Sequence, residues 1–148
     1  MIIVQEAPFD SATEVDDFMS GTVLSGGHVF FVGTVRQFDE GMTIAALELE
    51  HYPAMTESVL EELVAQAKRK WSLQKVKVIH RFGKLYPGEK IVFVGVSSAH
   101  RLAAFEACHF LIDFLKTKAP FWKLEHSAIG SAWVEAKQSD DNASALWD

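Results

Sequence analysis

The chain has 148 residues, which suggests a single domain with a proper hydrophobic core. It contains 49% apolar and 23% charged residues, as globular proteins do, and its formal net charge of −6 argues against the broad basic surface that non-specific nucleic-acid binding needs. The N-terminus lacks a signal-peptide pattern, and no apolar run approaches the roughly 20 residues of a membrane span. We therefore expect a cytoplasmic protein with neither nucleic-acid nor membrane partners.

Hydrophobic periodicity and turn signals predict strands and helices that alternate along the chain. In chain order, the predicted elements are a strand at 2–4, a helix at 11–19 capped by Asp10 or Ser11, a strand at 28–36, a turn at 37–41, a strand at 43–52, a helix at 53–71, a strand at 76–82, a turn region at 83–88, a strand at 91–97, a helix at 101–118 and closing strands at 121–125 and 132–137. Because several strands are joined by short turns, we expect an α+β domain over residues 1–139, with a mixed, mostly antiparallel sheet packed with two main helices. Residues 140–148 are expected to form a mobile C-terminal tail.

Cations lie near both ends of the helix predicted at 101–118, although the chain as a whole is acidic. His100 and Arg101 stand at its N-terminus, where partial positive charge disfavours a cation by a few tenths of a kcal/mol to about 1 kcal/mol. An anionic ligand such as a phosphate would make the arrangement favourable. Lys116 lies at the far end of the helix, and Lys123 follows shortly after it. We interpret this region as a candidate anion-binding site.

Each of these cations also has a purely structural interpretation. Lys116 could pair with Asp113, three residues earlier, on a solvated helix face. The other cations could be exposed residues at a helix start, on an edge strand or at the end of a strand: His100, Arg101, Lys123 and Arg36. The residues alone leave both interpretations open.

The long helix is also apolar on nearly all sides outside one polar stripe, as helices buried on more than one face are. Either it is sandwiched inside the domain, or it also packs against a second copy of the chain. Arg101 and Lys116 are 15 residues apart, or about 22 Å along a helix, so their side chains cannot easily meet. We hypothesise a homodimer whose pocket combines the N-terminal cations of one helix with the C-terminal cations of the other. Cys108, the single cysteine, lies in this helix and is expected to be a buried structural thiol.

Several segments together carry a family likeness that runs in order from about residue 28 to residue 140. They are residues 92–101 (VFVGVSSAHR), 104–107 (AFEA), 115–123 (LKTKAPFWK), 33–36 (GTVR), 49–57 (LEHYPAMTE), 80–83 (HRFG) and 133–136 (WVEA). With these segments the chain strongly resembles the large, catalytic subunit of molybdopterin synthase.

The resemblance implies a sulfurtransferase that converts cyclic pyranopterin monophosphate into molybdopterin by installing a dithiolene. Sulfur would arrive as a thiocarboxylate on the C-terminal Gly-Gly tail of a small ubiquitin-like sulfur-carrier subunit. Two large subunits would form a homodimer within a heterotetramer, with a hammerhead-like fold, and we expect no metal or other cofactor in the protein itself. The site residues implied by the motifs are Lys116 and Lys123 for catalysis and Arg36, His100, Arg101 and Lys137 for substrate binding.

The chain departs from the family pattern at two places. Residues 37–41 (QFDEG) form a more acidic loop than expected, and Lys137 stands where we expect an arginine that could bind phosphate through two hydrogen bonds. Two other functions compete with the synthase: a non-catalytic module that docks a ubiquitin-like tail, and a phosphoesterase. The phosphoesterase is weakened because no Asp/His cluster has metal-ligand spacing. Its candidate residues would be His51, His80 and His100.

Overall fold

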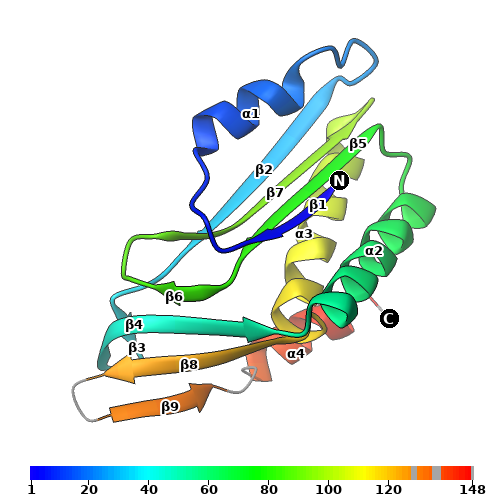
Figure 1. Ribbon diagram of the computed structural model, residues 1–148. Helices are drawn as coiled ribbons and strands as arrows, with labels where there is room; N and C mark the ends of the chain where they lie inside the picture. The colour runs from blue at the N-terminus through cyan, green and yellow to red at the C-terminus, as the bar shows by residue number, and fades with distance from the viewer. Residues whose placement is uncertain (128–129, 135–137, 148) are drawn as a thin grey trace.

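Two β-sheets form the framework of the protein, whose computed structural model describes residues 1–127, 130–134 and 138–147 (Figure 1). The first sheet has the strand order β1-β5-β7-β2. Its strands are β1 (Ile2–Gln5), β2 (Gly27–Thr34), β5 (Lys75–Arg81) and β7 (Lys90–Ser98). β1 runs parallel to β5, whereas the β5–β7 and β7–β2 pairings are antiparallel.

The second sheet contains the strand order β3-β4-β8-β9, with β6 paired to β4, and all of its pairings are antiparallel. Its strands are β3 (Phe38–Asp39), β4 (Met42–His51), β6 (Gly83–Leu85), β8 (Phe121–Ser127) and β9 (Gly130–Val134). The predicted α+β class with mostly antiparallel pairing is confirmed. The strands divide into two sheets, however, and do not form the one sheet that the sequence suggested.

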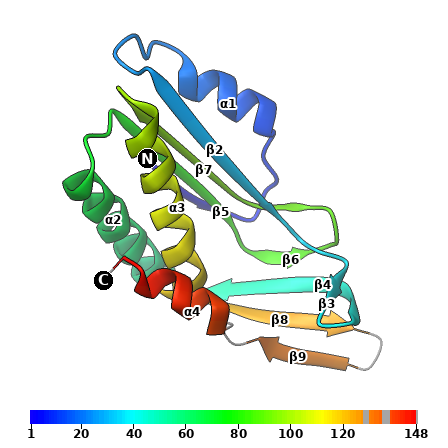
Figure 2. The same cartoon turned by 180° about the vertical axis from the view of Figure 1, so that it is seen from behind.

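Helices cover both faces of the first sheet (Figures 1 and 2). These helices are α1 (Ser11–Met19), α2 (Pro53–Lys70) and α3 (Arg101–Thr117), whereas α4 (Gln138–Ala145) packs against α3. In β7, Val94 and Val96 belong to the main core beneath α2 and α3, whereas Gly95 faces α1 on the other side, as strand alternation requires. A Cβ atom on Gly95 would lie 3.2 Å from the Phe18 ring, so glycine allows α1 to approach the sheet closely.

Helix α3 is buried in its middle and apolar at its exposed N-terminal end. Ala104, Phe110 and Leu111 are almost completely buried, whereas Leu102 and Phe105 are 66% and 60% exposed. The helix is therefore sandwiched inside the domain along most of its length and leaves apolar side chains uncovered near its start. Among the described helices, none is both long and apolar enough to cross a membrane.

The C-terminal segment forms helix α4, which packs against α3 (Figure 2). Beyond α4, the Trp147 indole Nε1 donates a 2.7 Å hydrogen bond to Asp113 Oδ2, and its ring packs edge-to-face on Trp71 and Phe110. The segment expected to be a tail from residue 140 thus contains helical structure. Its mobility in solution, and the domain limit at 139, stay predictions.

Two short strands, β3 and β6, lie in segments that the sequence predicts to be turns. In the 37–41 segment, β3 forms a tight hairpin with β4 through Glu40 and Gly41, whose φ angles are 50° and 80°. Positive φ at both central residues is typical of a type I′ turn, which matches the twist of the two strands. In the 83–88 segment, β6 contributes three residues that pair with β4. Such short strands carry too few residues to show alternation.

Candidate active site

A cavity of about 770 Å³ lies where the C-terminal end of α3 meets strands from both sheets. Its wall contains apolar residues of β2, β4 and α3 together with charged and titratable side chains. The latter are Arg36, Asp39, His80, Lys116, Lys123 and Glu125. Three cations from three separate segments therefore converge on one cavity, although the chain has a net charge of −6.

The ends of α3 and β8 position Lys116 and Lys123, the two side chains predicted to be catalytic. Lys116 lies in the last turn of α3, where the helix dipole favours a cation. Pro120 cannot continue the helix, and the chain then enters β8. Side chains alternate along β8, and Phe121, Lys123 and Glu125 face the cavity. The two lysines thus reach the same cavity from different elements.

Two of the structural interpretations of these lysines are wrong. β8 is paired on both sides, with β4 and with β9, so Lys123 does not lie on an edge strand. Asp113 is only 7% exposed, accepts the hydrogen bond from Trp147 and lies 3.2 Å from His109 Nε2. The helix face that carries Asp113 is therefore covered by the C-terminal segment and is not a solvated face.

Arg36 enters the cavity from the segment that follows β2. Its NH2 group donates a 3.4 Å hydrogen bond to Asp39 Oδ1, a residue of the acidic loop at 37–41. The side chains are 69% and 15% exposed, and an ion pair of this kind contributes only about 0–1 kcal/mol. Arg36 is thus an exposed residue at the end of a strand, as its structural interpretation predicts. Its guanidinium nevertheless lines a cavity where an anion could bind.

His100 and Arg101 lie at the opposite end of α3 and do not line this cavity in the same chain. His100 is the N-cap residue of α3 but makes no capping hydrogen bond through its side chain, and both residues are exposed. This placement agrees with the expectation that one helix cannot bring Arg101 and Lys116 together. Lys137, the remaining predicted site residue, lies outside the described residues.

One histidine, His80, lines the cavity although the sequence analysis did not place it there. The His80 ring stacks on Phe121, with 3.8 Å between ring centroids and 13° between planes, and Phe121 also contacts His51 at 5.6 Å. Burial of the His80 ring, reinforced by the charges of Lys123 and His51, lowers its pKa from 6.5 to about 4, although the hydrogen bond to Arg81 O opposes this shift. Alternation along β5 could have indicated the position, because His80 continues the inward-facing series of that strand.

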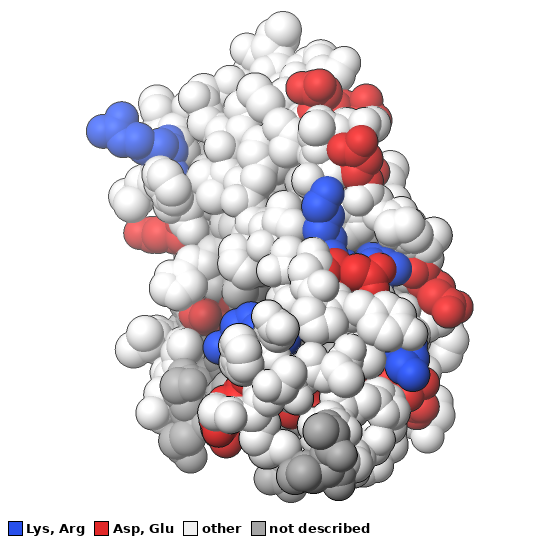
Figure 3. Space-filling model, turned by 90° about the vertical axis from the view of Figure 1, so that its left-hand side faces the viewer, with Lys and Arg blue, Asp and Glu red and all other residues white. Residues whose placement is uncertain are grey.

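Figure 3 shows one face of the molecule, on which Lys and Arg side chains form separate spots with Asp and Glu side chains among them. Scattered cations of this kind do not make the continuous basic surface that binds a nucleic-acid backbone. Arg36, Lys116 and Lys123, by contrast, converge on one cavity.

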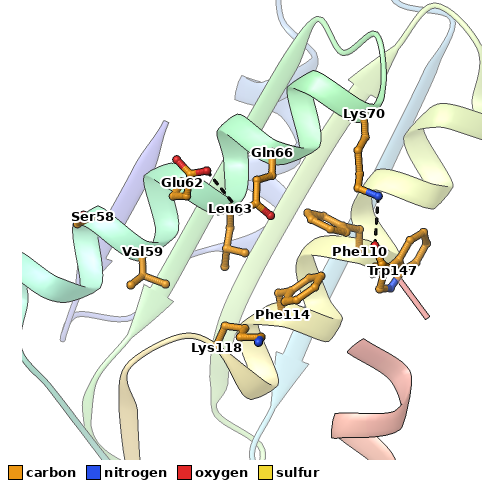
Figure 4. A pocket seen from close by; sticks show the side chains of 10 residues that line it. All are labelled: Ser58, Val59, Glu62, Leu63, Gln66, Lys70, Phe110, Phe114, Lys118 and Trp147. Carbon is orange, nitrogen blue, oxygen red and sulfur yellow. Dashed lines mark hydrogen bonds between the residues drawn. The ribbon is translucent and has the colours of Figure 1, made fainter. Parts of the chain in front are cut away.

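A second cavity of about 610 Å³ lies between α2 and α3 (Figure 4). Its wall combines apolar side chains, among them Leu63, Phe110 and Phe114, with a few polar groups. At one end, Lys70 Nζ donates a 3.3 Å hydrogen bond to the Trp147 carbonyl oxygen (Figure 4). No predicted site residue within the described part of the chain lines this cavity, whereas Arg36, Lys116 and Lys123 line the cavity at the C-terminal end of α3.

An α+β fold with a cationic cavity at the end of a long helix matches a known class of enzyme subunits. The family described as MoaE protein matches this chain over residues 4–118, and the chain belongs to that family.

Relatives and solved structures agree along almost the whole chain. The chain is 48% identical to the molybdopterin synthase catalytic subunit of Pseudomonas aeruginosa, over 99% of this chain and 98% of that protein. It is 52% identical to the same subunit of Haemophilus influenzae, over 99% and 97%. The molybdopterin biosynthesis MoaE protein of Burkholderia ambifaria superposes with a TM-score of 0.84 at 44% identity, over 99% and 97%.

These relatives confirm the prediction of a molybdopterin synthase catalytic subunit, a sulfurtransferase of molybdenum cofactor biosynthesis that adds sulfur to a pterin precursor. The alternative of a non-catalytic docking module is not favoured, because the relatives are catalytic subunits.

Proposed function

We propose that the cavity at the end of α3 is the active site of this sulfurtransferase, and that Lys116 and Lys123 carry the reaction. The observation that supports this assignment is that the two lysines, from α3 and β8, line one cavity together with Arg36. The substrate is cyclic pyranopterin monophosphate, whose phosphate is attracted by the cations. We further propose that the protein works in the cytoplasm.

Sulfur comes from a partner, because the chain's own thiol is unsuited to carrying it. Cys108 is 5% exposed, and burial raises its pKa to about 11, so it is a protonated and enclosed thiol at neutral pH. The sulfur donor is the thiocarboxylate on the Gly-Gly tail of a small ubiquitin-like subunit. That the relatives are named catalytic subunits supports a second subunit in the enzyme.

The two lysines have different roles in this proposal. Lys116 lies nearest the thiocarboxylate carbon and acts there as an acid, a base or a nucleophile. Lys123 orients the pterin or protonates the intermediate that forms on it. Arg36 and Lys137 hold the anionic end of the substrate, with Lys137 acting as a single point charge.

The active enzyme is a homodimer within a heterotetramer, and His100 and Arg101 of one subunit complete the site of the other. Support comes from the exposed apolar side chains at the start of α3, Leu102 and Phe105, and from Val23 and Leu24, which are 92% and 79% exposed. The loop that carries Val23 and Leu24 is hydrogen bonded to the end of β7, just before α3, because Gly26 N donates to Ser98 O at 3.0 Å. A second subunit that covers this apolar surface brings the N-terminal cations with it.

A turnover assay tests the proposed function. The pure chain is mixed anaerobically with a thiocarboxylated small subunit and cyclic pyranopterin monophosphate, and the dithiolene product is measured. We expect product from the natural chain and a rate at least about 100-fold lower from Lys116→Ala, the scale of a positioned acid–base group.

Lys118→Ala is the matched control for the assay. It removes the same charge two residues later, and Lys118 lines the other cavity, so its turnover should stay close to normal. Near-normal turnover of Lys116→Ala would contradict the catalytic role, and the absence of product from the natural chain despite binding of the small subunit would contradict the proposed function.

A further inference from the structure

A buried histidine forms the wall of the proposed active site beside Lys123. His80 lies near the end of β5, on the face that also carries Val76 and Val78. It is only 7% exposed, yet it lines the cavity. A polar ring buried this deeply needs hydrogen-bond partners, because an unsatisfied buried polar group costs roughly 1–3 kcal/mol.

One ring nitrogen of His80 has such a partner. Nδ1 lies 2.8 Å from the carbonyl oxygen of Arg81, and a carbonyl oxygen can only accept a hydrogen bond. Nδ1 therefore carries the proton, and Nε2 carries a lone pair in the neutral ring. With a pKa of about 4, the ring is neutral near pH 7. At that pH, His80 is a hydrogen-bond acceptor at Nε2 and carries no charge.

The other ring nitrogen of His80 is unpartnered within the described part of the chain, where Nε2 makes no hydrogen bond. The ring cannot reorient freely to find one, because it is stacked on Phe121 and tied to the backbone through Nδ1. The charged or titratable groups that act on it are Lys123 from β8 and His51 from β4, and both disfavour its protonation. A ligand in the cavity with an N–H donor would satisfy this acceptor.

We propose that His80 is a substrate-binding residue whose Nε2 accepts a hydrogen bond from a ring N–H or amino group of the pterin. The inference rests on the proposed function, since the pterin is the substrate proposed there. The cavity, at about 770 Å³, lies in the size range of small-molecule sites, roughly 300–1,000 Å³. The substrate is oriented with its donor-bearing ring toward the neutral acceptor and its phosphate toward the cations, so each end meets a complementary group.

Equilibrium binding of cyclic pyranopterin monophosphate to the full chain, measured anaerobically without the small subunit, tests this role. His80→Phe keeps an aromatic ring for the stack on Phe121 but removes the acceptor, and we expect Kd to rise about tenfold, the loss of one hydrogen bond. His80→Gln places an amide oxygen near the position of Nε2, and Kd should stay within about threefold of the natural value. At saturating substrate, kcat of both variants should stay within about threefold, because only ground-state binding is altered.

His126→Phe is the matched control. His126 lies on the outer face of β8, where its Nε2 is 3.0 Å from Glu48 Oε2, so the same change outside the cavity should leave Kd unaltered. Thermal unfolding establishes that each variant is folded.

Three results would overturn the inference. They are an unchanged Kd in folded His80→Phe, an equal loss of affinity in folded His80→Gln, and a fall in kcat at unchanged Kd, which would mean that His80 acts through Lys123. Any of these three results removes the inference about His80. If the natural chain still turns over normally, the proposed function is unaffected. Failure of the natural chain both to bind the pterin and to form product with the small subunit removes both.

Discussion

The two ends of α3 carry similar cations in very different surroundings. At the C-terminal end, Lys116 meets Lys123 and Arg36 in one cavity, because β8 and the segment after β2 return to the same place. At the N-terminal end, Arg101 is exposed beside apolar side chains such as Phe105, which is itself 60% exposed. The comparison teaches that a run of cations does not define a site. Convergence of separate segments defines one, and the N-terminal end of α3 achieves it only if a second subunit packs there.

The largest expected effect comes from separating the two ends onto different chains. Arg101→Ala and Lys116→Ala should each lose most of the activity. When the two variants are mixed and exchange subunits, half of the dimers combine one of each, and each such dimer keeps one intact site. We therefore expect activity to recover to about a quarter of the natural value.

Subunit exchange in this mixing experiment is verified by mass spectrometry of tagged chains. Verified exchange without recovery of activity would contradict a site shared between two chains. The control is a mixture of Lys116→Ala with Lys123→Ala. Both lysines line the same cavity of one chain, so each site of a mixed dimer lacks one lysine. No activity should be recovered in this mixture.

The two ends of α3 also differ in the burial of a titratable group, because the cavity at the C-terminal end contains the buried side chain of His80. The folded-state pKa of His80, about 4, lies below the unfolded value of 6.5, so the unfolded chain binds more protons between these pH values. The free energy of unfolding should therefore fall as pH drops from 6.5 toward 4, with a contribution from His80 of up to about 3 kcal/mol.

Denaturant unfolding at pH 7, 5.5 and 4.5 measures this loss of stability. His80→Gln should lose less stability than the natural chain over that interval, whereas His100→Gln, at the exposed end of α3, should follow the natural chain. Parallel curves for the natural chain and His80→Gln would contradict the neutral buried state of His80.

The middle of α3 separates the two ends and should be closed to reagents. Because burial raises the pKa of Cys108 from 9.0 to about 11, the thiolate fraction at pH 8 is about 100-fold lower than in an exposed thiol. Alkylation by iodoacetamide should be slower in the folded chain by at least this factor than in guanidinium. Mass spectrometry follows the single cysteine, and similar rates in both conditions would mean that the middle of α3 opens readily.

The sequence was sufficient to predict the elements whose apolar pattern extends over many residues. β4, β7, α2 and α3 have apolar patterns that extend over many residues, and the structure places them close to their predicted positions. It was insufficient for β3 and β6, because strands of two and three residues depend on their partner β4 and not on their own pattern. The division of the strands into two sheets was likewise missed, since pairing is a property of the packed chain.

The candidate site, like the fold, could be predicted only in part from the sequence. The order of residues along α3 already separates Arg101 from Lys116 by a distance that one helix cannot close, and the motifs specify the family and its sulfurtransferase chemistry. Packing in three dimensions supplies the rest. It brings Lys116 and Lys123 to one cavity and buries His80 against Phe121, where desolvation keeps the ring neutral. Local periodicity determines which way a side chain points, but which segments meet there depends on long-range strand pairing and core packing.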